Sequence, residues 1–181
     1  MNSRFHILET PLQGLNILQP KRLGDHRGYL ERMYCTADLE ALLGSRSIAQ
    51  INRTFTEKTG TVRGMHFQLP PHAEMKFVTC LKGEVFDVAV DLRTDSPTYL
   101  EWHAEILSGE NHKILVIPEG FAHGFQAQSD NCEMLYFHTA AYHPSAESGL
   151  NPRDPALAID WPLAVSEISE RDASHPFISK P

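Results

Sequence analysis

Short strands separated by turn residues dominate the central part of this 181-residue chain, and they constrain its fold more than any other feature. Strands are expected at residues 61–68, 76–81, 84–92, 100–107, 113–117, 124–128 and 133–139. The segments between them carry turn-forming pairs such as Pro70-Pro71, Lys82-Gly83 and Ser108-Gly109. Many short strands at this spacing, without alternating helices, predict an all-β sandwich or barrel.

A single segment has the pattern of a helix, and it precedes the strand-rich region. Thr36 is a suitable N-cap, three leucines follow at helical spacing, and Gly44 is a suitable end. The residues after Ala156 are rich in Pro, Asp and Ser, and we expect them to wrap around the barrel as turns. Because the length is that of one domain, residues 1–181 are expected to form a single all-β domain with one short helix.

The composition argues against several classes of function. The formal net charge of −7 at pH 7 disfavours a general nucleic-acid binder, which would carry a basic face. No apolar run reaches the roughly 18 residues of a membrane-spanning helix, and the first residues lack the pattern of a secretory signal. Cys35, Cys80 and Cys132 have the spacing of neither a disulfide framework nor a zinc site. We therefore expect a cytoplasmic protein without nucleic-acid or membrane partners.

Residues 84–92 alternate in a way that gives the expected strand two different faces. Asp87 and Asp91 share one face with two small or apolar residues, whereas the other face is entirely apolar. The polar face either points to solvent or lines a polar cavity inside a barrel, and the pattern alone is compatible with both arrangements.

Two clusters contain most of the residues with chemical potential. The first is the run from Arg63 to Gln68, and the second is the Pro-x-Gly-x-x-His-Gly element that ends with His123 and Gly124. On a regular strand, His66 and Gln68 would share one face and Arg63 would lie on the other. The second element is shared by many cupins, which are small jelly-roll barrels.

A metal-dependent cupin is one alternative, but the ligand set is poor. Gln68 occupies the position at which metal cupins carry a second histidine, and His66 and His123 alone do not provide the converging ligands that transition metals favour. His72, His112 and His175 are expected at the surface.

Six motifs in sequence order resemble those of the dTDP-4-dehydrorhamnose 3,5-epimerase family of sugar-nucleotide epimerases. They are RGMHFQ, KGEVFDVAVDLR, SPTYLEW, IPEGFAHGFQ, DPALAIDWP and ISERD. The similarity extends from about Gly14 to Pro176, nearly the whole chain. It implies a cupin-type jelly-roll β-barrel, a homodimer, no metal or other cofactor, and a nucleotide-diphosphate sugar as substrate.

The resemblance also implies roles for four catalytic residues. Protons at C3 and C5 of a 4-keto-6-deoxyhexose are acidic because both carbons are α to the C4 ketone, so inversion needs a base, an opposing proton donor and a stabiliser for the enolate. By the resemblance, His66 is the base and Asp172 is the carboxylate that orients it. Tyr136 matches the proton donor, and Lys76 matches the cation beside the enolate.

Further matched positions imply a nucleotide-binding region. Arg27 and Arg63 match arginines that contact the diphosphate, a role that suits the forked guanidinium. Gln50 and Asn52 match contacts to the nucleoside, and Tyr142 matches the aromatic residue that stacks on the base. His123, Glu147 and Arg171 also fall on binding positions of the family. The segment that holds Arg27 is implied to reach into the site of the partner subunit.

Several positions depart from the better-known members. Arg32 falls where those members place an acid that contacts thymine, and Glu31 is displaced by one residue. Because arginine only donates hydrogen bonds, dTDP, CDP and GDP all remain possible carriers. Phe137 and Ala141 also differ, which leaves open whether C3, C5 or both are inverted, and Pro152 replaces a residue that is often aromatic. A sugar-nucleotide-binding protein without catalysis is a further alternative.

Overall fold

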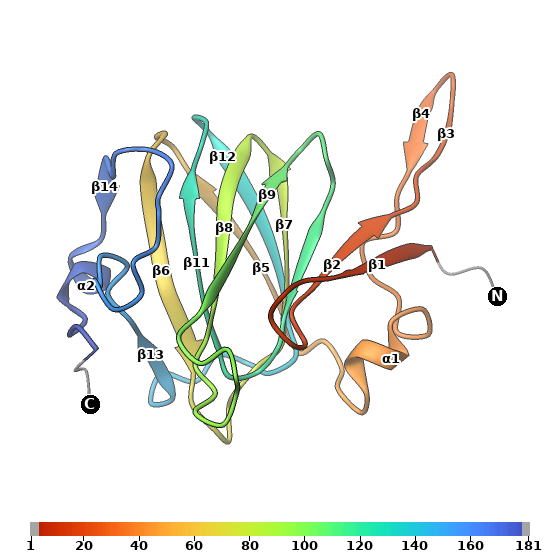
Figure 1. Ribbon diagram of the computed structural model, residues 1–181. Helices are drawn as coiled ribbons and strands as arrows, with labels where there is room; N and C mark the ends of the chain where they lie inside the picture. The colour runs from red at the N-terminus through yellow and green to blue at the C-terminus, as the bar shows by residue number, and fades with distance from the viewer. Residues whose placement is uncertain (1–3, 179–181) are drawn as a thin grey trace.

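Two antiparallel sheets pack face to face in the computed structural model, which describes residues 4–178 (Figure 1). The first sheet has the order β1 (Phe5–Glu9), β2 (Asn16–Pro20), β10 (Ile114–Ile117), β7 (Lys76–Lys82), β12 (Cys132–His138) and β5 (Gln50–Thr56). The second has the order β13 (Glu147–Gly149), β6 (Thr61–Gln68), β11 (Phe121–Ala127), β8 (Glu84–Asp91) and β9 (Trp102–Ser108). This is an all-β sandwich, as the strand spacing predicts, with the jelly-roll form that the resemblance implies.

Smaller elements lie around this sandwich. The strands β3 (Leu23–Asp25) and β4 (Gly28–Leu30) form a hairpin that projects from the body (Figure 1). The helices are α1 (Glu40–Leu43) and α2 (Glu170–Ser174), and β14 (Glu167–Ile168) pairs in parallel with β6. None of the helices within residues 4–178 is long and apolar enough to span a membrane.

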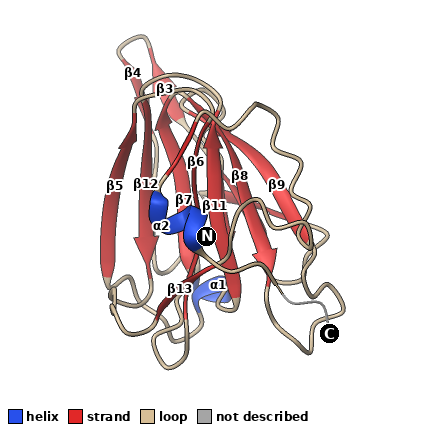
Figure 2. Ribbon diagram, turned by 90° about the vertical axis from the view of Figure 1, so that its left-hand side faces the viewer, coloured by secondary structure: helices blue, strands red, loops and turns tan. Residues whose placement is uncertain are grey.

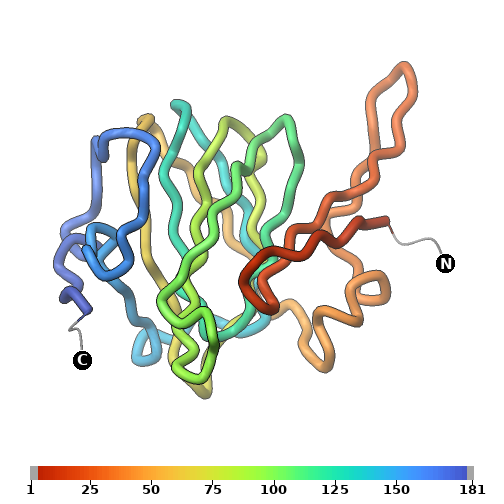
Figure 3. The backbone as a smooth tube through the Cα atoms, in the orientation of Figure 1, coloured from red at the N-terminus to blue at the C-terminus, as the bar shows by residue number. Residues whose placement is uncertain are grey.

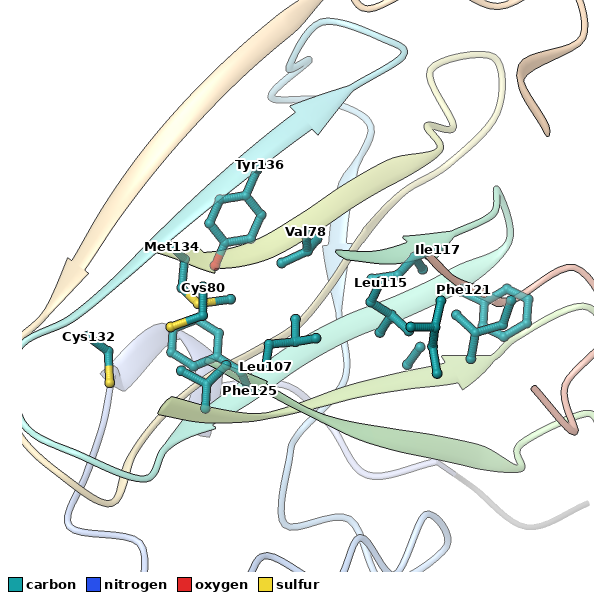
Figure 4. Close-up of a cluster of buried hydrophobic side chains, with 14 of the residues drawn as sticks. Val78, Cys80, Leu107, Leu115, Ile117, Phe121, Phe125, Cys132, Met134 and Tyr136 are labelled. Atoms are coloured by element: carbon teal, nitrogen blue, oxygen red, sulfur yellow. The ribbon is translucent and has the colours of Figure 1, made fainter. Parts of the chain in front are cut away.

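The main core lies between the two inner faces. It contains buried side chains from both sheets, including Val78, Leu115, Phe125 and Met134, with Tyr136 at its edge (Figure 4). Burial of apolar surface contributes roughly 25 cal/mol per Å², so this layer is a principal source of stability.

The outer faces of the two sheets are also covered. The segment around α1 packs Leu39 and Leu43 against Phe77 of the first sheet. The chain after β13 packs Leu157 and Trp161 against the second sheet, and it runs along the outside of β6 (Figures 2 and 3). β10 is apolar at every position, whereas β7, β8 and β11 each carry a few polar residues among the buried apolar ones.

The expected strands of the central region are all present, with small differences at their ends. The additional strands β1, β2 and β5 were not expected, and neither was the β3–β4 hairpin. The sequence of β5, QINRTFT, is largely polar because the strand lies at a sheet edge, with Ile51 and Phe55 exposed. Its conformation is determined by pairing with β12 along its whole length.

The helix prediction is partly wrong. Thr36 does not cap α1, whose N-cap is Leu39 without a side-chain hydrogen bond, although the helix does end at Gly44. The C-terminal segment wraps around the second sheet as expected, but it also contains α2, a helix that was not predicted. Ser169 caps α2 by accepting a hydrogen bond from the backbone N–H of Asp172 (3.0 Å).

A β-bulge in β6 corrects the face assignment made from the sequence. His66 pairs with His123 and Arg63 pairs with Phe125, so three steps along β6 oppose two along β11. The extra residue places Arg63 and His66 on the same cavity, although regular alternation would separate them. At the bulge, Gly64 has a φ of +122° and lies directly against Gly124.

We predict that Gly124→Ala destabilises the fold by roughly 2 kcal/mol, because over-packed cores typically lose about 1–3 kcal/mol. A Cβ at Gly124 would lie 2.7 Å from the carbonyl oxygen of Arg63 and 3.2 Å from Cα of Gly64, both backbone atoms at the bulge. Urea denaturation measures the change. Gly24→Ala in the exposed hairpin is the control, and equal stabilities of the two variants would contradict the prediction.

Candidate active site

A cavity of about 1050 Å³ opens between β5 and β12 on one side and β6 on the other. Side chains of β7 and β11 form its floor, and the segment from Ser166 to Asp172 closes one wall. All the site residues expected from the sequence line this cavity except Arg27 and Arg32. The sandwich therefore brings together residues that are more than 100 positions apart in the chain.

A histidine–carboxylate pair lies on one wall. Nε2 of His66 is 2.8 Å from Oδ1 of Asp172, whose other oxygen accepts the backbone N–H of Gly64 at 3.0 Å. The imidazole is one-third exposed to the cavity, whereas the carboxylate is buried. Burial raises the pKa of Asp172, but the hydrogen bonds from His66, Gly64 and Ser169 outweigh it, so the net pKa is lowered. The pair provides an oriented base with a carboxylate that stabilises its protonated form.

Tyr136 lies on the first sheet and faces the same cavity. Its ring is buried and lies edge-on to the ring of His123, with 6.0 Å between centroids. Burial, followed by the negative charge of Asp87, raises the pKa of Tyr136 well above its usual value. The phenol therefore keeps its proton at neutral pH, as a proton donor must.

Asp87 resolves the two interpretations of the alternating strand. Its side chain is fully buried and both carboxylate oxygens lie near Nε2 of His123, at 2.9 and 3.0 Å. Burial raises the pKa of Asp87, although His123 and Lys76 oppose that effect. The polar face of β8 thus points into the sandwich and supports a cavity residue. Asp91, on the same face, accepts hydrogen bonds from Arg93, Ser96 and Thr98.

Lys76 supplies a positive charge near the base. Its Nζ is 3.3 Å from the backbone oxygen of His66 and 3.0 Å from Oε1 of Glu74. His138 lies directly across from Lys76 on β12. Burial, together with the positive charges of Lys76 and His123, lowers the pKa of His138 to about 4, so its imidazole is neutral at pH 7.

The part of the cavity beside the start of β5 carries polar and aromatic groups. Oε1 of Gln50 accepts the backbone N–H of Tyr142 at 2.9 Å, and Nε2 of the same amide donates to Asn52 at 3.2 Å. The half-exposed Tyr142 donates to Glu147 at 2.7 Å, and Glu147 also pairs with Arg171.

Arg63 adds a guanidinium near the opposite end of β5. It donates to the hydroxyl of Thr56 (3.0 Å) and to the backbone oxygen of Phe55 (3.1 Å). The cavity as a whole therefore offers hydrogen bonds, an aromatic face and positive charge.

Gln68 has a structural explanation that the sequence did not suggest. Its amide donates to the backbone oxygens of His72 (3.0 Å) and Ala141 (3.3 Å) and to Glu74, and it accepts from the backbone N–H of His143 at 2.7 Å. It thereby connects β6 to the loop before β7 and to the loop after β12. Within the part of the chain that the structure describes, no three His, Cys, Asp or Glu side chains are grouped to hold a metal ion.

Arg27 and Arg32 do not reach the cavity of their own chain. Arg27 lies at the tip of the projecting hairpin, where it pairs with Asp25 at 2.6 Å and remains largely exposed. Arg32 pairs with Asp38 at 2.9 Å. The role of these two residues in binding, and the expectation that the Arg27 segment reaches the site of a partner subunit, stay predictions.

Other lining residues were not found from the sequence. Glu74, Arg153 and Thr54 belong to no recognised motif, and only their positions in the fold bring them to the cavity. The hydroxyl of Thr54 is buried and has no hydrogen-bond partner within residues 4–178. His138 also lines the cavity, because the alternation of β12 places it on the same face as Tyr136.

Comparison with known proteins places these residues in context. The family model described as dTDP-4-dehydrorhamnose 3,5-epimerase matches residues 9–180. The enzyme of that name from Salmonella typhimurium is 41% identical over 176 residues, which cover 96% of each chain. A dTDP-4-dehydrorhamnose 3-epimerase from Streptomyces niveus is 38% identical, over 89% of this chain and 78% of its own.

Solved structures agree with this assignment. The crystal structure of dTDP-6-deoxy-D-glucose-3,5-epimerase from Legionella pneumophila, in complex with dTDP-4-keto-L-rhamnose, superposes with a TM-score of 0.90. It is 41% identical, and the match covers 96% of this chain and 92% of that one.

We predict that Asp172 makes folding pH-dependent. Because its pKa is lowered in the folded state, its contribution to the free energy of unfolding is complete above the unfolded value of about 3.9 and is lost as the pH falls through the folded pKa. Urea denaturation of wild type and Asp172→Asn should give a stability difference that shrinks as the pH falls below about pH 4. A difference that does not vary with pH would contradict this assignment.

Proposed function

The chain belongs to the dTDP-4-dehydrorhamnose 3,5-epimerase family, and from this premise we propose that its cavity inverts C3, C5 or both in a nucleotide-linked 4-keto-6-deoxyhexose. The protein is then an isomerase that acts on a sugar nucleotide. The observation that carries the proposal is the presence of a carboxylate-oriented imidazole and a protonated phenol in one cavity.

The first step is removal of a proton from C3 or C5 by His66. The electron pair of the broken C–H bond forms an enolate with the C4 carbonyl, and the proton moves to the imidazole. Asp172 stabilises the imidazolium through the 2.8 Å hydrogen bond. Lys76, whose ammonium lies beside the backbone of His66, supports the negative enolate oxygen.

The second step is reprotonation of the same carbon from the opposite face. Tyr136 donates its proton to the carbon and becomes a phenolate, and the enolate returns to the ketone with the inverted configuration. Proton exchange with water then restores the imidazole and the phenol. Tyr136 and His66 come from different sheets, which supports their placement on opposite faces of a sugar.

The remaining polar and aromatic residues of the cavity account for the nucleotide. Arg63 and Arg171 would contact the diphosphate, Gln50 and Asn52 the base, and the exposed ring of Tyr142 would stack on it. His123 would contact the sugar. Glu147 would contribute through Arg171, with which it forms an ion pair. We propose dTDP as the carrier, because the matched relatives are named for dTDP sugars.

Arg27 and Arg32 lead us to propose a homodimer with exchanged arms. The hairpin projects away from its own sandwich (Figure 1). Its side chains Leu23, Tyr29 and Leu30 are exposed. A partner subunit would bury these side chains, and the hairpin would bring Arg27 to the partner's cavity. Arg32 lies just after the hairpin and would then approach the base.

Inversion of a single centre is a second candidate. One matched relative is named as a 3-epimerase. Phe137, which departs from the family pattern, packs in the cluster with Leu39 and Phe77 and does not line the cavity. The cavity geometry is compatible with either outcome, so the experiment must report on each carbon separately.

We predict that the protein exchanges substrate protons with deuterated water. Proton NMR of dTDP-4-keto-6-deoxyglucose in deuterated buffer should show loss of the signals at C3, C5 or both. His66→Ala should abolish exchange at every exchanged carbon because it removes the base. Tyr136→Phe should slow product formation more than the initial exchange, because it leaves the base in place.

The outcomes separate the alternatives. No exchange with dTDP, CDP or GDP forms of the sugar, despite binding, would favour a non-catalytic sugar-nucleotide-binding protein. Exchange that a chelator abolishes and a divalent metal restores would favour the metal-dependent cupin. Full activity of His66→Ala would contradict the assignment of the base.

A mixing experiment tests the exchanged arms. Arg27→Ala and His66→Ala should each be weakly active or inactive alone, since each cavity would combine Arg27 of one chain with His66 of the other. Co-refolding equal amounts should form mixed dimers in which one cavity carries both wild-type residues, and recovery approaching one-quarter of wild-type activity is expected from random pairing. Absence of recovery, with mixed dimers demonstrated by mass spectrometry, would contradict arm exchange.

A further inference from the structure

A buried carboxylate contacts Lys76, and the proposed mechanism does not use it. Oε1 of Glu74 lies 3.0 Å from Nζ of Lys76, and both side chains are at least nine-tenths buried, with exposed fractions of 7% and 8%. The second carboxylate oxygen accepts a hydrogen bond from Gln68. Glu74 also lines the cavity, so its contacts are part of the wall that a substrate would meet.

The position of the Lys76 ammonium depends on few groups. A lysine side chain has four methylene groups and rotates about each of their bonds. Without fixed partners its ammonium would be distributed over several rotamers. The described acceptors are Glu74 and the backbone oxygen of His66, which approach it from the loop before β7 and from β6. Burial of an unpaired ammonium is costly, so the carboxylate makes the buried charge tolerable and also fixes its position.

The neighbouring groups do not take the place of Glu74 as the anionic partner of the Lys76 ammonium. His138 faces Lys76 across the strand pair, but its imidazole is neutral at pH 7 and its Nδ1 lies 3.9 Å from Glu74. Asp87 is already engaged with His123. Glu74 is therefore the carboxylate in direct contact with the ammonium within residues 4–178.

We propose that Glu74 is a positioning residue for the epimerase reaction, which holds the Lys76 ammonium where the enolate oxygen develops. This inference rests on the proposed function. Glu74 would act through Lys76 and not on the reacting carbon itself. Gln68 holds the Glu74 carboxylate and also bonds the loops before β7 and after β12.

Glu74→Gln tests the proposal because it keeps the shape and removes the charge. We expect kcat for deuterium exchange into dTDP-4-keto-6-deoxyglucose to fall roughly 10-fold or more, with KM within about twofold, since the lost interaction acts on the enolate and not on the bound ketone. Glu105→Gln is the matched control, because Glu105 pairs with Lys113 at 2.6 Å on the outside of the cavity. It should leave kcat unchanged.

A double-mutant cycle distinguishes positioning from a structural role. Once Lys76→Met has removed the ammonium, adding Glu74→Gln should cause no further loss of kcat, whereas independent effects would multiply. Multiplicative losses, or wild-type kcat in the single variant, would overturn the proposal. If Glu74→Gln alone does not fold, the comparison of Lys76→Met with the double variant decides the question in the same way. Failure of the wild type to exchange deuterium would instead refute the proposed function.

Discussion

The carboxylate of Asp172 is the interaction on which the candidate site depends. It forms hydrogen bonds with the imidazole of His66 and with the backbone N–H of Gly64, which lie 106 and 108 positions away in the sequence. It thereby fastens the C-terminal segment to the bulge of β6 and orients the base with the same pair of oxygens. Loss of the carboxylate would affect the wall of the cavity and the chemistry together, since one group serves both purposes.

Local arrangement also explains how an acidic protein can accept an anionic ligand. The chain carries a formal charge of −7, yet Arg63, Lys76 and Arg171 all line one cavity. The carboxylates nearby are paired: Glu74 with Lys76 and Glu147 with Arg171. The electrostatic potential that a ligand meets in the cavity is set by these ion pairs and by the other cations that line it. The net charge of the whole chain is a poor guide to that potential.

Much of the site could be predicted from the sequence, because its residues lie in motifs whose order and spacing are specific. His66, Tyr136, Lys76 and Asp172 all line the cavity as the resemblance implies. The face of Arg63 could not be predicted, because a bulge breaks the alternation on which such predictions rest. Glu74 was missed because it lies in a loop outside any motif.

Which strands could be predicted from the sequence has a similar explanation. Central strands with two buried faces have strong apolar patterns and were expected, whereas the polar edge strand β5 and the short β3–β4 hairpin depend on pairing with other segments or copies. Propensity contains no information about such partners, so these elements could not be identified in advance.

The bulge in β6 has a consequence for how the site measures its ligand. Arg63 and His66 lie on one strand, so three residues of backbone, and no flexible loop, set the separation of their Cα atoms. The bulge between them is held where Gly64 lies against Gly124. Under the proposed function, in which Arg63 contacts the diphosphate and His66 is the base, this stretch of backbone sets how far the reacting sugar must lie from the diphosphate.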